Sequence, residues 1–378
     1  MRPVLPTDEQ IQKRVQQILR RGSLNVGGNA PMDRLMLMFT RSCELRCSYC
    51  FVDLDEEDDG EVFAGQYRGL LPRGELGRET LSQAIDLLMT SSKPRLGLQT
   101  FGGEPTRCFD RVLEMIELSL EHPRRQGRPV EFLVTTNGLS LSAERIAALQ
   151  RPGVVVELSL DGDQRGNRFR RPLVLPADEA WAATEAAVER LKGSGLRWFM
   201  NATLPPAAAG ELGATWAWAR ARAVPALQIN YGTGMAWTRA QVETWLLGLQ
   251  AMLAEHRADP RGMELLNWAN DADPVPLCGD IIVDVDGTVL QVGGLFHERR
   301  FPQLREPYLR GQVGELAGFE GLRFTLQGLW ERTRQVLGPR EWEIFAGNVA
   351  LGAAVDLVVQ VARRSGSARL QPPLTPSA

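Results

Sequence analysis

The hydrophobic pattern alternates between two periods from about residue 33 onward. Short apolar runs of strand length recur at 35–40, 96–101, 130–136, 154–160, 198–203 and 227–231. Between them, apolar residues recur with helical period at 79–90, 111–121, 142–150, 180–192 and 239–256. Strands that alternate with helices in this way indicate repeated β-α units around a parallel sheet.

Six such units are visible, too few for the usual eight-stranded barrel. The pattern therefore predicts an α/β fold, either a partial barrel or an open twisted sheet, and the spacing alone does not choose between them. We assign residues 33–271 to this core and residues 1–32 to an N-terminal helical extension.

The alternation of strand-length and helical segments ends near residue 271. Two short apolar runs, 281–285 and 288–292, flank Asp286 and Gly287, a strong signal for a two-residue hairpin turn. Helical patterns follow at 322–336 and 344–363. We therefore expect a small C-terminal unit over 272–364, and the composition of 365–378 predicts a disordered tail.

Composition and charge narrow the function classes. With 43 Lys and Arg against 46 Asp and Glu, the chain has a net charge of −3 and no strongly basic field, which argues against a nucleic acid partner. Five cysteines in 378 residues do not resemble a disulfide framework and fit the reducing cytoplasm. The N-terminus lacks an apolar run, and the apolar stretch 349–361 is short and interrupted by Asp356 and Gln360, so no membrane segment is expected.

Three of the five cysteines fall within CELRCSYC, residues 43–50, directly after the first predicted strand. A loop with this spacing can wrap Cys43, Cys47 and Cys50 around one cluster. Three thiolates on a four-iron cubane leave one iron open to an external ligand, as a reactive cluster requires. The alternative is structural zinc, which needs four ligands. The fourth would have to come from Cys108, Cys278, His122, His256 or His297.

This segment resembles the signature of the radical S-adenosylmethionine (SAM) family, CxxxCxxC in the loop after the first barrel strand, with Tyr49 at its usual aromatic position. The resemblance implies a partial (β/α)6 TIM-like barrel and a [4Fe-4S] cluster on Cys43, Cys47 and Cys50. It also implies that SAM chelates the open iron. Reductive cleavage of SAM would then yield a 5′-deoxyadenosyl radical that abstracts hydrogen.

Further motifs match the family at the ends of the next strands. FGGEP, residues 101–105, is similar to the GGEP motif that binds the SAM amino group. TTNG (135–138) and LSLDG (158–162) correspond to the family's TNG and SxDG. An arginine about a dozen residues after the Ser reaches the SAM carboxylate in related members, and Arg171 matches by spacing. The resemblance thus implies SAM contacts at Tyr49, Gly102, Gly103, Glu104, Asn137, Ser159, Asp161 and Arg171.

The segment 276–294 resembles the start of the SPASM or twitch domain of peptide- and protein-modifying members. Cys278, Gly279 and the turn at Asp286 and Gly287 match, but the second cysteine is absent and none follows Cys278. One thiolate cannot hold an auxiliary cluster, so we expect a single cluster and a degenerate C-terminal unit. Cys108 is interpreted as a buried structural residue.

Three functions remain open at this point. The first is radical modification of a peptide or protein side chain, and the second is radical chemistry on a small biosynthetic substrate. The third is a non-catalytic module that binds iron-sulfur or zinc. An enzyme would need an external electron donor such as a flavodoxin or ferredoxin, and neither the reaction nor a catalytic acid or base is indicated.

Overall fold

The computed structural model describes the chain except for residues 1–4, 22–31, 53–71, 261, 270–273 and 368–378. Its core strands are β1 (Met32–Thr40), β3 (Arg95–Gly102), β4 (Val130–Thr136), β5 (Val154–Ser159), β7 (Arg197–Leu204) and β8 (Ala226–Tyr231). These strands are all parallel and neighbour each other in chain order. All six were predicted from the hydrophobic pattern, and the partial barrel is confirmed.

The sheet continues at both edges. Strand β9 (Glu264–Leu265) follows β8, and on the other side β10 (Ile281–Val283), β11 (Thr288–Gln291) and β12 (Leu309–Gln312) follow β1. The predicted hairpin is β10–β11, and it joins the main sheet, because β10 pairs in parallel with β1 through Leu35 and Ile281. The C-terminal unit is thereby built directly onto the strand that leads into the cysteines.

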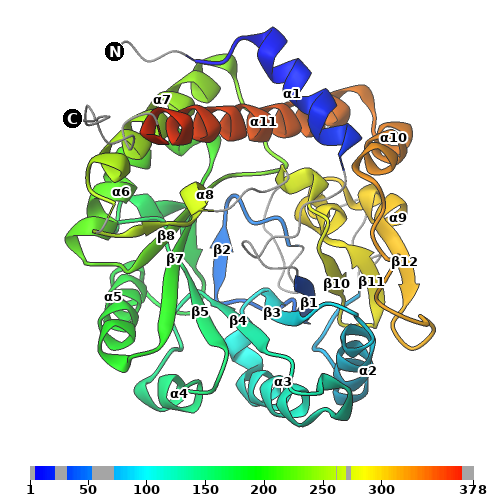
Figure 1. The fold of residues 1–378 in the computed structure, drawn as a ribbon. Coiled ribbons are helices and arrows are strands. Elements are labelled where there is room, and N and C mark those ends of the chain that lie inside the picture. Colours follow the sequence, from blue (N-terminus) through cyan, green and yellow to red (C-terminus); the bar gives the residue numbers. More distant parts are fainter. Residues whose placement is uncertain (1–4, 22–31, 53–71, 261, 270–273, 368–378) are drawn as a thin grey trace, which may run out of the picture.

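Helices cover the outer face of the curved sheet (Figure 1). They are α2 (Arg78–Met89), α3 (Phe109–Glu121), α4 (Ala143–Ala148), α5 (Ala177–Ser194), α6 (Leu212–Ala221) and α7 (Arg239–Ala258). The pattern did not indicate α6, whose buried face consists of the spaced residues Leu212, Thr215, Trp216 and Ala219 in an otherwise Ala- and Trp-rich segment. The short helices α8 (Leu266–Ala269) and α9 (Arg305–Tyr308) and the longer α10 (Leu326–Val336) complete the described helices outside the two at the chain ends.

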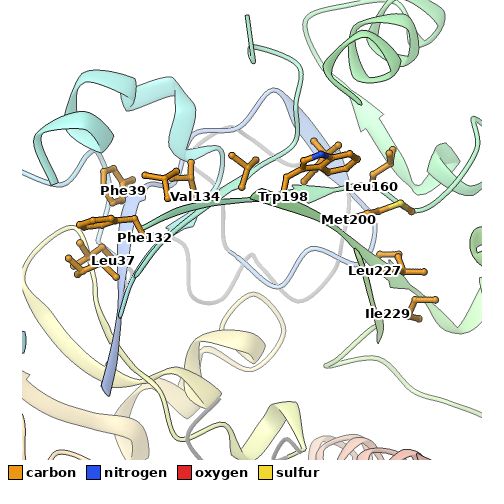
Figure 2. Packing of buried hydrophobic residues seen from close by; sticks show 14 of the residues in the cluster. Leu37, Phe39, Phe132, Val134, Leu160, Trp198, Met200, Leu227 and Ile229 are labelled. Atoms are coloured by element: carbon orange, nitrogen blue, oxygen red, sulfur yellow. The ribbon is translucent and has the colours of Figure 1, made fainter. Parts of the chain in front are cut away.

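The main core lies between the sheet and these helices. Figure 2 shows its members, among them Leu37, Phe132 and Leu227, on the convex side of the arched sheet. Because side chains alternate along a strand, the intervening residues face the concave interior of the partial barrel. These inner positions are where polar side chains can be offered to a ligand.

Two helices at the chain ends lie across the open side of the barrel (Figure 1). Helix α1 (Asp8–Arg20) begins with a capping box, and α11 (Pro339–Ser367) extends past the predicted end at residue 363. By length and composition α11 could cross a membrane, but 50% of that stretch is buried within the fold. Its Asp356 pairs with Arg14 of α1 (Oδ2 to Nε, 2.5 Å), as expected of a packed helix. The predicted tail lies outside the described residues from 368 onward.

Candidate active site

The cysteine loop is held by a small sheet of its own. Strand β2 (Leu45–Cys47) pairs antiparallel with β6 (Arg170–Pro172), so that Cys47 lies directly opposite Arg170. The Ser48 amide continues this pairing by donating to the Phe169 carbonyl at 2.8 Å. A segment from beyond β5 therefore fixes the middle of the loop between β1 and the rest of the barrel.

The thiols of Cys43, Cys47 and Cys50 lie close enough to influence one another. Burial raises the pKa of all three, that of Cys47 to about 12, and the neighbouring thiols raise the pKa of Cys43 further. Such thiols stay protonated until a metal ligates them, since ligation displaces the proton. The loop therefore concentrates three potential thiolates in a buried place.

Structural zinc and a cubane cluster place different demands on these thiols. Within the described ranges, no three His, Cys, Asp or Glu side chains are grouped so as to hold a single metal ion. A tetrahedral zinc with Zn–S bonds of about 2.3 Å would require thiolates about 3.8 Å apart. A cubane keeps its protein thiolates farther apart, because each ligates a different iron.

The two glycines after β3 allow two loops to touch. A Cβ on Gly102, whose φ is +127°, would lie 2.3 Å from the Thr40 carbonyl oxygen, and one on Gly103 would lie 2.3 Å from that of Ser42. Instead, the Gly103 amide donates to Thr40 O at 2.8 Å. The absence of side chains at these two positions therefore allows the end of β3 to pack directly against the start of the cysteine loop.

Glu104 is turned inward and is 1% exposed. One carboxylate oxygen accepts hydrogen bonds from the Thr106 amide (3.0 Å) and hydroxyl (2.6 Å), and the other accepts from the Asn137 amide at 2.6 Å. Burial raises its pKa, and its charge in turn raises the pKa of Cys43. Glu104 thus joins the ends of β3 and β4 and places negative charge beside the cysteines.

Asn137 connects the same region to the cysteine loop. Its Nδ2 lies 4.0 Å from the Cys43 sulfur and donates to Glu44 Oε2 at 3.3 Å, while its Oδ1 accepts from the Leu139 amide at 2.9 Å. The TNG motif therefore contacts the loop at its first cysteine.

Tyr49 and Asp161 form a second connection. The Tyr49 hydroxyl donates a short hydrogen bond to Asp161 Oδ2, and Oδ1 accepts from the Thr203 amide at 2.9 Å. Burial raises the pKa of both side chains. Ser159, two residues before Asp161, is only half-buried and faces the barrel interior beside Asn201 of β7.

The arginine buried at this place is Arg170, one residue before the arginine chosen by spacing. Arg170 is 8% exposed, donates to the Ser159 carbonyl oxygen and lies opposite Cys47, whereas Arg171 is exposed. The pairing of β6 decides this difference, because consecutive strand residues point to opposite faces. The sequence pattern of four arginines carried no sign of which one faces inward.

Two further arginines were not anticipated. Arg299 donates to the carbonyl oxygens of Cys47 and Cys50, both at 3.4 Å, and Arg300 donates to those of Cys50 (3.2 Å) and Ser48 (2.9 Å). We define Arg299 and Arg300 as the arginine clamp. It comes from the C-terminal unit, so this unit contacts the cysteine loop directly without supplying a second cysteine.

The donor set fits an iron-sulfur cluster. Three clustered thiols provide the ligands, and Arg170 with the arginine clamp places positive charge around an otherwise anionic group. Cys278 packs against the same apolar cluster as Cys43 and Cys50, while Cys108 is buried beneath the start of α3. Each of these two is a single thiol outside the triplet.

Residues 37–207 match the family model described as the Radical SAM superfamily. Among curated relatives, the radical SAM cyclopropyl synthase TigE of Paramaledivibacter caminithermalis is 22% identical over 137 residues, 36% of this chain and 28% of that protein. GTP 3′,8-cyclase of a Synechococcus species is 32% identical over 141 residues, 35% of each chain. The chain thus spans about a third of the length of these relatives.

The fold is also similar to solved structures. Native anSMEcpe with bound AdoMet and Kp18Cys peptide aligns with a TM-score of 0.63 at 14% identity, covering 88% of this chain and 100% of that chain. The same protein with AdoMet alone gives a TM-score of 0.62. At this identity the likeness demonstrates a shared fold.

Proposed function

Because residues 37–207 match the model of the Radical SAM superfamily, a family that uses a [4Fe-4S] cluster and SAM, we propose that this chain is a radical SAM enzyme that modifies a peptide or protein side chain. When bound, the cluster and SAM supply an electron and a radical that abstracts hydrogen from the substrate. Cys43, Cys47 and Cys50 would hold the cluster.

The chain's own residues shape the place for SAM. The negative charge of Glu104 beside Cys43 suits the cationic amino group, and the buried guanidinium of Arg170 suits the carboxylate. Arg170 thus takes the role that spacing assigned to Arg171. The amide of Asn137 holds Glu104 in place, next to the close contact made by Gly102 and Gly103. The hydrogen bond from Tyr49 to Asp161 connects the cysteine loop to the segment that follows β5.

The observation that carries the peptide assignment is the position of the C-terminal unit. Hairpin β10–β11 extends the sheet beside β1, and the arginine clamp connects the unit to the cysteine loop. The full-length likeness to anSMEcpe, a structure that names a bound peptide, supports the assignment. The second candidate is a small-molecule substrate, favoured by the 32% identity to GTP 3′,8-cyclase in the shared segment.

An external reductant is part of the proposal. No second group of cysteines accompanies the triplet in the sequence, so the electron comes from a protein such as a flavodoxin or ferredoxin. Free cysteines and an oxygen-sensitive cluster are suited to the reducing cytoplasm, where we place the chain.

The test is anaerobic reconstitution with iron and sulfide, followed by dithionite and SAM and chromatography for 5′-deoxyadenosine. We expect this product from the wild type, its loss in Cys47→Ala and its retention in Cys108→Ala, a matched cysteine outside the triplet. A fully loaded wild type that leaves SAM intact, alone and with candidate substrates, would support the non-catalytic alternative.

The substrate class is tested by co-expression with short peptides encoded beside the gene. Mass spectrometry should detect a peptide whose mass changes with the wild type and not with Cys47→Ala. Unchanged peptides, together with a converted metabolite in the same extracts, would favour the small-molecule candidate.

A further inference from the structure

Five polar side chains cross the concave face of the sheet. They are Gln99 on β3, Thr135 on β4, Glu157 on β5, Asn201 on β7 and Asn230 on β8, and we define them as the inner polar belt. Each is connected to the next by a hydrogen bond or through Glu157. Of these five, only Thr135 belongs to a motif discussed above, as the first residue of TTNG.

Glu157 is the centre of this belt and its only ionisable member. Its Oε2 accepts from Gln99 Nε2 and from the Thr135 hydroxyl, both at 3.1 Å, and its Oε1 accepts a short hydrogen bond from Asn201 Nδ2. Asn201 in turn accepts from Asn230 Nδ2 at 2.7 Å. All of the donors to this carboxylate are neutral.

No cation of the described residues lies within ion-pair distance of Glu157. The charge of Arg34 lowers the pKa of Glu157, but Arg34 itself is paired with Glu131 at 3.6 Å. Burial raises the pKa of Glu157, the direction expected for a carboxylate that lacks a cationic partner. Buried carboxylates are normally paired, so this one is set up for a partner from outside the fold.

The belt lies at a level where a substrate could reach it. Toward the amino ends of the strands, the inner face next carries a layer of buried apolar side chains. These are Leu133, Val155, Phe199 and Ala226. Two residues toward the carboxyl end of β5 comes Ser159, about 7 Å away at the ordinary rise of a strand. Glu157 retains 7% exposure and Asn201 is half-buried, so the belt is not sealed within packed core.

We propose that the inner polar belt is a substrate subsite, in which Glu157 binds an ammonium or guanidinium group of the substrate inside the barrel. The inference rests on the proposed function, because it places a substrate's cationic side chain below the cysteine loop. Oε1 of Glu157 accepts one hydrogen bond, from Asn201, and a carboxylate oxygen can accept two. Asn230 donates to Asn201 and so extends the belt to β8. A charged donor adds the countercharge that the three neutral donors lack.

The experiment uses the reconstituted protein with SAM and two probes that differ in charge. These are N-acetyl-lysine methylamide and its neutral analogue N-acetyl-norleucine methylamide, with dissociation constants measured by NMR titration. We expect the wild type to bind the lysine probe ~10-fold more tightly, which corresponds to about 1.4 kcal/mol, because a hydrogen bond to a charged group is stronger than one between neutral groups. Glu157→Gln should reduce this ratio below about 2-fold.

Glu131→Gln is the matched control, because Glu131 is an inner-face carboxylate that already has arginine partners. It should keep the preference. Asn230→Lys provides a second variant, in which an internal ammonium competes with the probe and removes the preference, should Glu157→Gln not fold. Equal binding of both probes by the wild type, or an unchanged ratio in Glu157→Gln or Asn230→Lys, would overturn the proposal.

The outcome is separable from that of the proposed function. A wild type that forms 5′-deoxyadenosine but shows no preference for the lysine probe contradicts the subsite alone. A wild type that prefers the lysine probe but never cleaves SAM contradicts the radical function alone.

Discussion

Arg170 lies directly opposite Cys47 in the β2–β6 pair, and its guanidinium donates a hydrogen bond to the carbonyl oxygen of Ser159. One buried arginine thereby connects the middle cysteine of the loop with the end of β5. Its neighbour Arg171 points to the opposite side of the same short strand and is exposed.

This relationship predicts different effects for two adjacent substitutions. Arg170→Ala should weaken SAM binding by ~10-fold or more, because it removes a charge-assisted contact to the carboxylate. Arg171→Ala should bind SAM nearly as the wild type does. Equilibrium dialysis of the reconstituted variants measures both, and a larger loss in Arg171→Ala would return the role to that residue.

The arginine clamp should raise the reduction potential of the cluster. The Arg299→Gln substitution removes a positive charge and so destabilises the reduced cluster, which is more negative than the oxidised one. The reduction potential should therefore fall by tens of millivolts. A shift of about 59 mV corresponds to a tenfold change in a one-electron equilibrium. A redox titration followed by electron paramagnetic resonance measures the shift. The exposed Arg332→Gln, elsewhere in the C-terminal unit, serves as control, and equal potentials in both variants would contradict the clamp's influence.

A buried ion cluster attaches the C-terminal unit to the barrel. Arg41 has no exposed side-chain surface and donates to Asp284 Oδ2 at 2.8 Å and to Glu298, while Arg305 also reaches Asp284 at 2.6 Å. Arg41→Ala leaves buried carboxylates undercompensated and should lower the free energy of unfolding by about 3–5 kcal/mol. Urea unfolding measures it, with the exposed Arg165→Ala as control. A loss below about 1 kcal/mol would show that Arg305 alone suffices.

His297 should make stability depend on pH. Burial lowers its pKa to about 4, while His297 also packs between Phe301 and Phe345. The unfolded chain, with an ordinary pKa of about 6.5, binds the proton first, so stability is complete above pH ~6.5 and falls as the pH drops toward 4. The loss from this residue approaches about 3 kcal/mol.

Urea unfolding of the wild type and His297→Gln at several pH values isolates this contribution. The variant should be less stable at pH 7 but lose less stability between pH 6.5 and 4.5. Parallel pH dependences in the two proteins would mean that His297 does not govern the effect.

The sequence by itself determined the architecture and indicated the kind of chemistry. Hydrophobic periodicity located all six core strands, since strands of a parallel sheet covered by helices carry mostly apolar runs. The spacing of Cys43, Cys47 and Cys50 indicated a cluster, because ligands within one short loop need no tertiary information to be recognised. The hairpin at Asp286 and Gly287 was evident for the same local reason.

Only the tertiary structure decided which distant groups meet. The burial of Arg170 rather than Arg171 depends on the register of β6 against β2, and the arginine clamp depends on a segment about 250 residues beyond the cysteines in the chain. The neutral surroundings of Glu157 depend on side chains from three other strands. Periodicity assigns a residue to a face, but the neighbours of that face come from the packing of the whole sheet, and those neighbours determine charge, burial and function.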